Sequence, residues 1–393
     1  MAWELSKVED QRKELVEAYL SGSENMTDLS KRFKIQRKTG YKWVNRYREH
    51  GLAGLTDQSR APHNPHRTYD EQAIQMAIDL KFKKRSWGPK KILSRLKRDY
   101  PNRAWPSATR LYEIFKELHL VTPRRFRSRV PATHPLEHAK QGNDVWAADF
   151  KGDILLGDGS RSVPLTITDS HTRFLLHCGD LPKRRSEFVW AVYDNLFHIY
   201  GLPLRIRTDN GPPFGSKGAG RLTPLAVKLI KAGVIPEWIN PGHPEENGRH
   251  ERMHSTLQAD TATPAGKTLT LQNQRYRVFQ QEYNYERPHE ALDMKVPAEC
   301  YNPVYRAWDG ILRSPEYDRS EYEVRKVGAS GCIWLNGEEF YITQTLTGEY
   351  VGLKQDEEGR VLAHYGAVYL GTLADKRRLN RPKLKPKKII RRG

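Results

Sequence analysis

The chain has 393 residues, with 66 Lys and Arg against 47 Asp and Glu, and its formal net charge is +19 at pH 7. That length suggests about two to four domains of roughly 150 residues each. The excess of positive charge favours a polyanionic partner, nucleic acid first, because basic side chains gain affinity by releasing counterions from phosphates. A membrane partner is disfavoured, since the sequence shows no signal peptide, lipidation motif, long apolar stretch or strongly amphipathic basic helix.

The cysteines argue against stabilisation by disulfides or by a zinc ion. Cys178, Cys300 and Cys332 are odd in number, scattered, and form no C-x-x-C pair. They support neither a disulfide framework nor a cysteine-based zinc site. We therefore expect a soluble, intracellular protein.

Residues 1–50 have the pattern of a helix-turn-helix domain. Helices are expected at 9–20, at 27–33 with Thr27 as its cap, and at 36–47, the last one basic. Val44 and Tyr47 repeat at helical spacing beside Trp43 and are expected to pack inward. The residues left to meet DNA on the third helix are Arg37, Lys38, Tyr41 and Lys42. The alternative is a solvated basic surface.

Gly40 is unusual inside this third helix. A glycine there costs about 1 kcal/mol unless it lets the backbone approach another group closely. The following segment, 51–68, is rich in Gly, Pro and polar residues and is expected to be a linker.

Residues 69–121 predict a second three-helix module. Helices are expected over 69–85, after Trp87-Gly88, and after Pro106-Ser107, which are start signals. Candidate DNA contacts in this module are Lys90, Lys91, Ser107, Thr109 and Arg110. The alternative is a structural bundle that positions its neighbour. The next segment, 122–142, combines prolines with four arginines and is expected to follow a phosphate backbone as a basic linker. Those arginines are Arg124, Arg125, Arg127 and Arg129.

Residues 143–300 predict an α/β core. Strands are expected at 145–151, 163–168, 174–181, 204–208 and 235–239, with helices at 186–200, 223–232 and from about 248. Hairpin strands followed by strands that alternate with helices give a mixed sheet, as in ribonuclease H-like folds.

Three acids stand out in this core. Asp149 and Asp209 each end a short apolar run, and Glu251 lies in the first turns of a helix that follows a Pro- and Gly-rich stretch. A crossover connection can lay the Asp209 strand beside the Asp149 strand. Carboxylates brought together in this way suit Mg²⁺, which prefers oxygen ligands and leaves positions for phosphate oxygens.

The surrounding motifs carry a family resemblance. W-x-x-D-F at 146–150, T-D-N-G-x-x-F at 208–214 and H-P-x-x-N-G-x-x-E-R at 243–252 together resemble the D-D-E signature of retroviral-integrase-type transposases, especially those of bacterial insertion sequences. The second helical module is similar to the second helix-turn-helix of the same transposases. The resemblance implies a bacterial, nucleoid-associated, cytoplasmic enzyme that acts as at least a dimer on double-stranded DNA.

The same resemblance implies the chemistry. The enzyme would bind the terminal inverted repeats of a mobile element, cleave DNA to release a 3′-hydroxyl, and transfer that end into target DNA. Two Mg²⁺ ions, with Mn²⁺ as the alternative, would be held by Asp149, Asp209 and Glu251. The residues expected to support this site are Asn210, Gly211, Asn247 and His254.

Two departures from the family pattern are visible. Asp209 and Glu251 have 41 residues between them, more than is usual in the family, which suggests an insertion in the loop 215–220. Counting residues alone would instead select Glu245 as the third acid, whereas the local motif selects Glu251. Gln258 replaces a basic residue of the family pattern.

The rest of the chain predicts a helix around 272–285, a small β-barrel over 317–375 and a basic tail over 376–393. Arg287 and His289, after that helix, are either DNA contacts or part of a helix C-cap with ordinary surface charge. Two other functions stay open for the whole chain: a non-enzymatic DNA-binding regulator with a relic core, and a structure-selective nuclease of the same fold.

Overall fold

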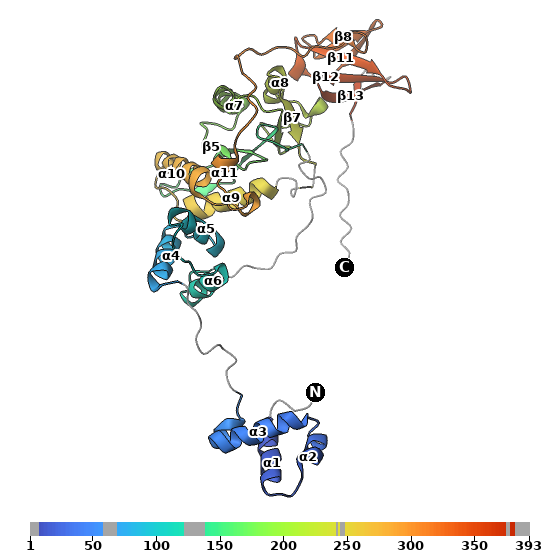
Figure 1. Cartoon of the computed structure of the whole chain (residues 1–393). Coiled ribbons are helices and arrows are strands. Elements are labelled where there is room, and N and C mark those ends of the chain that lie inside the picture. Colours follow the sequence, from blue (N-terminus) through green and yellow to red (C-terminus); the bar gives the residue numbers. More distant parts are fainter. Residues whose placement is uncertain are drawn as a thin grey trace. The chain divides into compact units, whose positions relative to one another are not determined.

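A computed structural model describes residues 8–57, 69–121, 138–240, 243, 248–374 and 378–381 (Figure 1). The chain divides into two compact units, Met1–Arg67 and Thr68–Gly393. Asn247, Glu245, Glu246 and the four arginines of the basic linker lie outside the described residues, so their predictions stay untested. Among the described helices, none is long and apolar enough to cross a membrane.

The first unit is the expected helix-turn-helix. It contains α1 (Val8–Leu20), α2 (Met26–Arg32), α3 (Arg37–His50) and the short η2 (Gly51–Leu55). Leu15, Val16, Trp43 and Val44 form its core with Met26 and Leu55. Helix α2 is capped by Asn25, whose Oδ1 accepts from the N–H groups of Thr27 and Asp28 at 3.0 Å each. The predicted cap at Thr27 is therefore wrong, because Asn25 already satisfies the first free N–H groups.

Gly40 has a packing reason. A Cβ at this position would lie 2.3 Å from Sδ of Met26, which is buried. The absent side chain lets α2 and α3 pack closely, which compensates for the helix propensity lost at a glycine.

The predicted linker is wrong for residues 51–57, which pack on this unit. Leu55 is buried in its core. Arg12 lies 3.9 Å from the centroid of the Trp43 ring and donates a 2.7 Å hydrogen bond to the carbonyl of Leu55. Arg12 also pairs with Asp57 at 2.9 Å. These contacts hold a Gly-rich segment whose composition alone resembles a linker.

The second unit begins with the second helical module. Its helices are α4 (Glu71–Lys83), α5 (Pro89–Asp99) and α6 (Ala108–Glu117). Trp87, Ile92, Leu111 and Phe115 are buried at its centre. The buried ammonium of Lys81 donates to the carbonyls of Arg85 and Trp87 at 2.6 and 2.9 Å, which fixes the turn between α4 and α5.

The core contains the expected mixed sheet, with strand order β5-β4-β1-β6-β7. Its strands are β1 (Val145–Phe150), β4 (Leu165–Asp169), β5 (Leu175–Gly179), β6 (Arg205–Thr208) and β7 (Ile235–Trp238). Strands β1, β4 and β5 are antiparallel neighbours, and β6 and β7 run parallel to β1. A short hairpin of β2 (Ile154–Leu155) and β3 (Arg161–Ser162) lies between β1 and β4 in the chain.

Helices cover both faces of this sheet. Trp146 and Ala148 of β1 belong to one core cluster with α7 (Ser186–Tyr200) and α8 (Pro224–Lys231). The alternate residues of β1 face α9 (Gly248–Thr261), which packs with α10 (Leu269–Gln281) in a second cluster. The π-helical turn η5 (Glu282–Glu286) and α11 (Pro297–Cys300) follow. The core extends past residue 300, because Tyr301, Trp308 and Leu312 pack into the first cluster.

The C-terminal strands form one sheet, ordered β8-β11-β12-β13-β14-β10-β9. They are β8 (Glu323–Lys326), β9 (Cys332–Leu335), β10 (Glu338–Tyr341), β11 (Tyr350–Gln355), β12 (Val361–Tyr365), β13 (Val368–Ala374) and β14 (Arg378–Asn380). In the described part of the chain no ladder joins the outer strands β8 and β9, so the expected closed barrel is wrong and the sheet is open. After β8, the N–H group of Val327 donates a backbone hydrogen bond to the carbonyl of Glu349, and its carbonyl accepts one from the N–H group of Gly348. The turn Gly328–Gly331 then leads into β9.

The predicted boundary at residue 375 is also wrong, since β14 lies beyond it. Strand β14 pairs antiparallel with β13 and parallel with β10. One side of the sheet packs on α8 and on the short η3 (Ala219–Arg221), with Ala226 and Val227 in the same cluster as Ile333 and Leu353.

Candidate active site

The sheet brings Asp149 and Asp209 side by side. Asp149 is the fifth residue of β1, and Asp209 directly follows β6. The parallel register pairs Ala147 with Arg207, so two residues further along Asp149 stands opposite Asp209. Glu251 lies in the first turn of α9, the helix that covers this face of the sheet.

The charges of Asp209 and Glu251 both act on Asp149. Burial raises the pKa of Asp149 to about 7, with a further contribution from the charge of Asp209 and a smaller one from Glu251. Burial also raises the pKa of Asp209, against the effect of the Gly211 N–H group, which donates to its carboxylate at 3.2 Å. Carboxylates in this state repel one another until a proton or a cation neutralises them.

Repulsion between these carboxylates is the reason why the three acids suit a divalent cation. Oxygen ligands with a shared excess of negative charge are what Mg²⁺ prefers. Within the described residues, however, no three His, Cys, Asp or Glu side chains already stand in a metal-holding arrangement. Glu251 is exposed and follows the segment 244–247, which lies outside those residues.

The loop after Asp209 is anchored by Asn210. Its Nδ2 donates to the carbonyl of Ile239 at 2.9 Å, and its Oδ1 accepts from Nη1 of Arg221 at 2.6 Å. Asn210 and Gly211 thus lie where the sequence predicts loop-shaping residues. Arg221 was not predicted; it stands at the end of the loop in which we expect an insertion.

Two histidines hold α9 against the sheet. Thr166 donates from Oγ1 to the carbonyl of Asp149 at 3.0 Å, and the same oxygen lies 2.7 Å from Nε2 of both His250 and His254. Because the Thr166 hydroxyl donates its proton to that carbonyl, its oxygen accepts hydrogen bonds from both histidine rings. Nδ1 of His254 lies 4.0 Å from the Asp149 carboxylate.

Both rings are neutral near pH 7. Burial lowers the pKa of His254 to about 4 and lowers that of His250 well below 6.5. His254 was an expected supporting residue, whereas His250 and Thr166 were missed. The signal for His250 was present, since residues four apart share a helix face.

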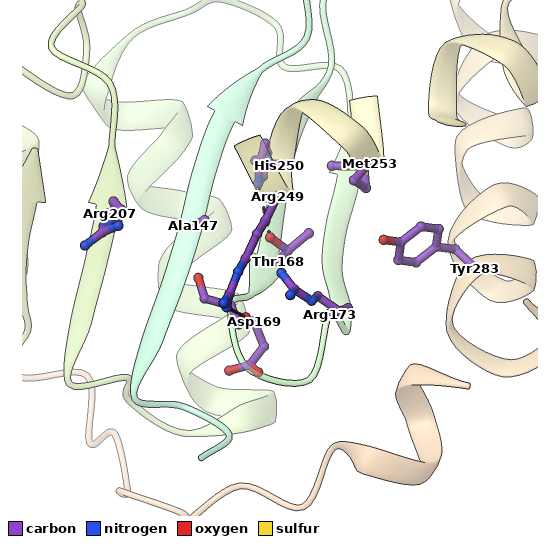
Figure 2. Close-up of a pocket in the computed structure, with 10 residues that line it drawn as sticks. Ala147, Thr168, Asp169, Arg173, Arg207, Arg249, His250, Met253 and Tyr283 are labelled. Carbon is purple, nitrogen blue, oxygen red and sulfur yellow. Dashed lines mark hydrogen bonds between the residues drawn. The ribbon is translucent and has the colours of Figure 1, made fainter. Parts of the chain in front are cut away.

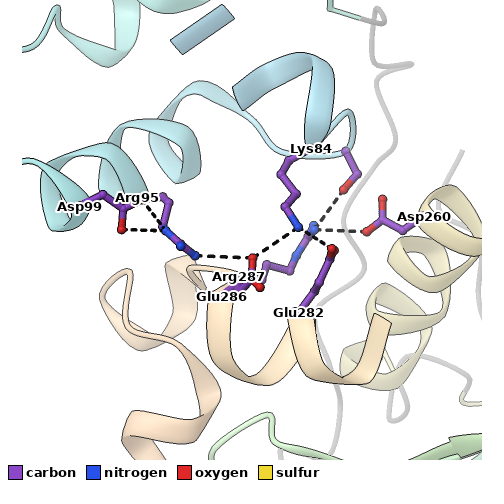
Figure 3. A network of polar contacts seen from close by, with 8 residues as sticks. Lys84, Arg95, Asp99, Asp260, Glu282, Glu286 and Arg287 are labelled. Atoms are coloured by element: carbon purple, nitrogen blue, oxygen red, sulfur yellow. Dashed lines mark hydrogen bonds and ion pairs between the residues drawn. The ribbon is translucent and has the colours of Figure 1, made fainter. Parts of the chain in front are cut away.

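Charged contacts join the second helical module to the core (Figure 3). Lys84 pairs with Glu282 at 2.5 Å and Glu286 at 3.4 Å, and Arg95 reaches Glu286 at 3.6 Å. Arg287 donates to Ser86 Oγ at 3.0 Å and pairs with an oxygen of Asp260, near the end of α9, at 3.5 Å.

Arg287 is the C-cap of the π-helical turn η5, as one alternative held, and its N–H group donates to the carbonyl of Glu282 at 2.8 Å. Its side chain is only 6% exposed and is held in this network, so it is not an ordinary surface charge. His289 is half-buried, and burial lowers its pKa to about 3. Contact of either residue with DNA stays a prediction.

The expected DNA contacts differ in their surroundings. Those of α3 are all exposed, namely Arg37, Lys38, Tyr41 and Lys42. In the second module Lys90 and Thr109 are exposed, and Lys91 is half-buried. Ser107 caps α6 by accepting from the Arg110 N–H group at 3.1 Å, and Arg110 pairs with Glu113 at 3.1 Å and Glu117 at 3.6 Å.

Comparison with known families gives three matches along the chain. A helix-turn-helix domain matches residues 11–63, a homeodomain-like domain matches 39–115, and an integrase core domain matches 232–297. The last match contains Glu251.

The similar proteins come from mobile elements, and two of them are uncharacterised. A 31.7 kDa protein of insertion element IS407 from Burkholderia multivorans is 26% identical over 56% of this chain and 78% of its own length. A 39.2 kDa protein of insertion element IS476 from Xanthomonas euvesicatoria is 24% identical over 72% of this chain and 80% of its own. The transposase for transposon Tn552 of Staphylococcus aureus is 22% identical over 63% of this chain and 55% of its own length.

The magnesium complex of the HTLV-2 integrase catalytic core aligns with 42% of this chain and 99% of its own, at 14% identity and a TM-score of 0.33, which is too low to bear on the site. The chain thus has helix-turn-helix domains and an integrase core domain and is similar to proteins of mobile elements, which is consistent with a DDE transposase.

Proposed function

We propose that this protein is a transposase that binds the terminal inverted repeats of a mobile element and catalyses metal-dependent 3′-end cleavage and strand transfer into target DNA. The observation that carries the proposal is the effect of two neighbouring acids on a third. Asp209 and Glu251 both raise the pKa of Asp149 at the edge where β1 and β6 run side by side.

Asp149, Asp209 and Glu251 are the residues that would hold the divalent ions, two Mg²⁺ or Mn²⁺ per site. A bound divalent ion supplies Lewis-acid activation of phosphate oxygens. The protein itself positions the acids. Asn210 ties the Asp209 loop to the end of β7, and neutral His254 supports α9 beside Asp149.

Recognition of the element end is assigned to the two helical modules. The exposed face of α3 offers four polar side chains for a DNA groove, and the start of α6 offers a second set. The basic linker over 122–142 would add phosphate contacts. Two DNA ends must be joined in concert, so the active form is at least a dimer on double-stranded DNA.

The test uses labelled duplexes that carry the matching inverted repeats flanking the coding sequence. Asp149→Asn and Asp209→Asn should abolish nicking and joining in Mg²⁺ while end binding stays near the wild-type value. Asp153→Asn is the matched control, because Asp153 is exposed and close in sequence to Asp149. Activity near wild type in either of the first two variants would refute the assignment of the acids.

A further inference from the structure

Three arginines line a cavity on the same face of the sheet as Asp149 and Asp209 (Figure 2). Arg173 follows β4, Arg207 belongs to β6, and Arg249 belongs to the first turn of α9. With Ser170 and Thr168 they enclose a cavity of about 20 Å³, room for about one water molecule while the side chains keep these positions. Figure 2 shows Arg173 and Arg249 converging beside Thr168 and Asp169, with Arg207 across β1.

The guanidinium of Arg173 has no direct acidic partner in the described part of the chain, and the charge of Asp169 acts on it only weakly. Among the described residues it makes no hydrogen bond and no ion pair, although the residue is half-buried. Burial and the positive charge of Arg249 together lower the pKa of Arg173 to about 10. A buried charge is ordinarily paired, so an unpaired one surrounded by like charges calls for an anion.

Other donors at the cavity are also unused. The Ser170 hydroxyl and Nη1 of Arg207 are buried without a hydrogen-bond partner in the part of the chain described here. Arg207 is 8% exposed, and its Nε donates to Glu237 at 2.6 Å. Nη1 of Arg249 donates only to the carbonyl of Ser170, at 2.9 Å.

The two nearby acids, Asp169 and Glu237, offset only part of the charge of the three arginines, and Asp169 forms no direct ion pair with any of them in the described residues. Both carboxylate oxygens of Asp169 are occupied, one by the N–H and hydroxyl of Thr172 at 2.7 Å each and the other by the Asn143 N–H at 2.9 Å. Glu237 is already paired with Arg207. The cavity therefore keeps a net positive charge and free donors.

We propose that this cavity binds a phosphate group, held by Arg173 and Arg249 with the Ser170 hydroxyl. The planar guanidinium presents paired N–H groups that match phosphate oxygens, as a lysine would not. Arg249 is exposed and forms the outer wall, so rotation of its side chain opens the cavity to a ligand. The His250 ring behind it is neutral and closes the inner side.

The phosphate has two sources, the DNA backbone or a free phosphate compound. Ala147 lines the cavity and precedes Asp149 by two residues on β1, about 7 Å along the strand. Successive nucleotides of one DNA strand advance about 3.4 Å along the helix axis. A backbone phosphate about two nucleotides from the acids therefore falls within reach, and this choice of source rests on the proposed function.

The test measures binding of inorganic phosphate to the full chain, by thermal shift and calorimetry, against chloride at matched ionic strength. Wild type should be stabilised by phosphate. Arg173→Gln and Arg249→Gln should bind phosphate at least about tenfold more weakly, as expected when a charge-assisted pair is lost. Arg161→Gln, which removes an exposed arginine outside the cavity, should bind as wild type does.

A second arm identifies the source. If it is DNA, both cavity variants lower the slope of log affinity against log salt by about 1, while Asp149→Asn leaves that slope unchanged. Loss of phosphate binding with an unchanged slope supports a free phosphate ligand and refutes the DNA source. No stabilisation of wild type beyond chloride, or equal stabilisation of all variants, overturns the site, whatever the nicking assay shows.

Discussion

The raised pKa of Asp149 predicts that the metal-free protein is destabilised by its own active site. In the unfolded chain this carboxyl has its ordinary pKa of 3.8, whereas in the folded protein the pKa is about 7. The folded state therefore holds the proton more tightly, and stability falls as pH rises from 3.8 to about 7 and then levels off. The full difference corresponds to about 4 kcal/mol, and the side chain is only 22% exposed, so solvent screening leaves most of it.

Replacing Asp149 by Asn removes this effect. In EDTA, the Asn variant should be more stable than wild type by about 4 kcal/mol at pH 8 and by about 2 kcal/mol at pH 5. Urea denaturation followed by tryptophan fluorescence measures both values. The exposed Asp153→Asn variant should show neither effect. Added Mg²⁺ should then stabilise wild type and not Asp149→Asn.

The reasoning fails if Asp149→Asn is no more stable than wild type at pH 8. It also fails if the gain is the same at pH 5 and pH 8, because a gain independent of pH cannot come from a titrating carboxyl.

Three further predictions concern the third acid, recognition and the module contact. Glu251→Gln should lose cleavage and joining while Glu245→Gln keeps both in the labelled-end assay; the opposite result would show that the motif is misaligned. Deleting residues 1–120, which contain both helical modules, should remove discrimination between the element end and a scrambled duplex in gel shifts but leave salt-sensitive binding, and unchanged specificity would place recognition elsewhere in the chain. Arg287→Leu should destabilise the second unit by about 1 kcal/mol in urea, since the hydrogen bond to Ser86 and the pair with Asp260 are lost, and a loss below about 0.5 kcal/mol would mean that these contacts contribute little.

The sequence predicts those parts of the fold whose signals are local. Ser107 is a helix cap and is recognisable as one, and Asp209 is recognisable because a turn follows a short apolar strand. The mixed sheet follows from the order of such elements. Both aspartates therefore take the positions expected of them.

Features that depend on distant partners could not be predicted. Leu55 packs in a core although its neighbours are glycines, and Arg287 is buried by Ser86 and Asp260, which are remote in the chain. Strand β14 lies in a basic run and joins its sheet through backbone pairing, to which side-chain patterns are blind. Whether the C-terminal sheet closes into a barrel depends on backbone pairing between its outer strands, β8 and β9, and no local residue pattern encodes that pairing.

The shared core between α8 and the C-terminal sheet limits how this protein can be divided or recombined. Ala226 and Val227 are buried against Ile333 and Leu353, and Lys231 on the same helix pairs with Glu349 at 2.7 Å. A sheet transplanted from a relative would arrive without the helix that completes its interior. Exchange of the C-terminal sheet alone should therefore produce aggregating proteins, because apolar surface on both pieces would be left uncovered. Helix α8 cannot move with the sheet, since its Leu225 and Leu229 pack in the core cluster that contains Trp146.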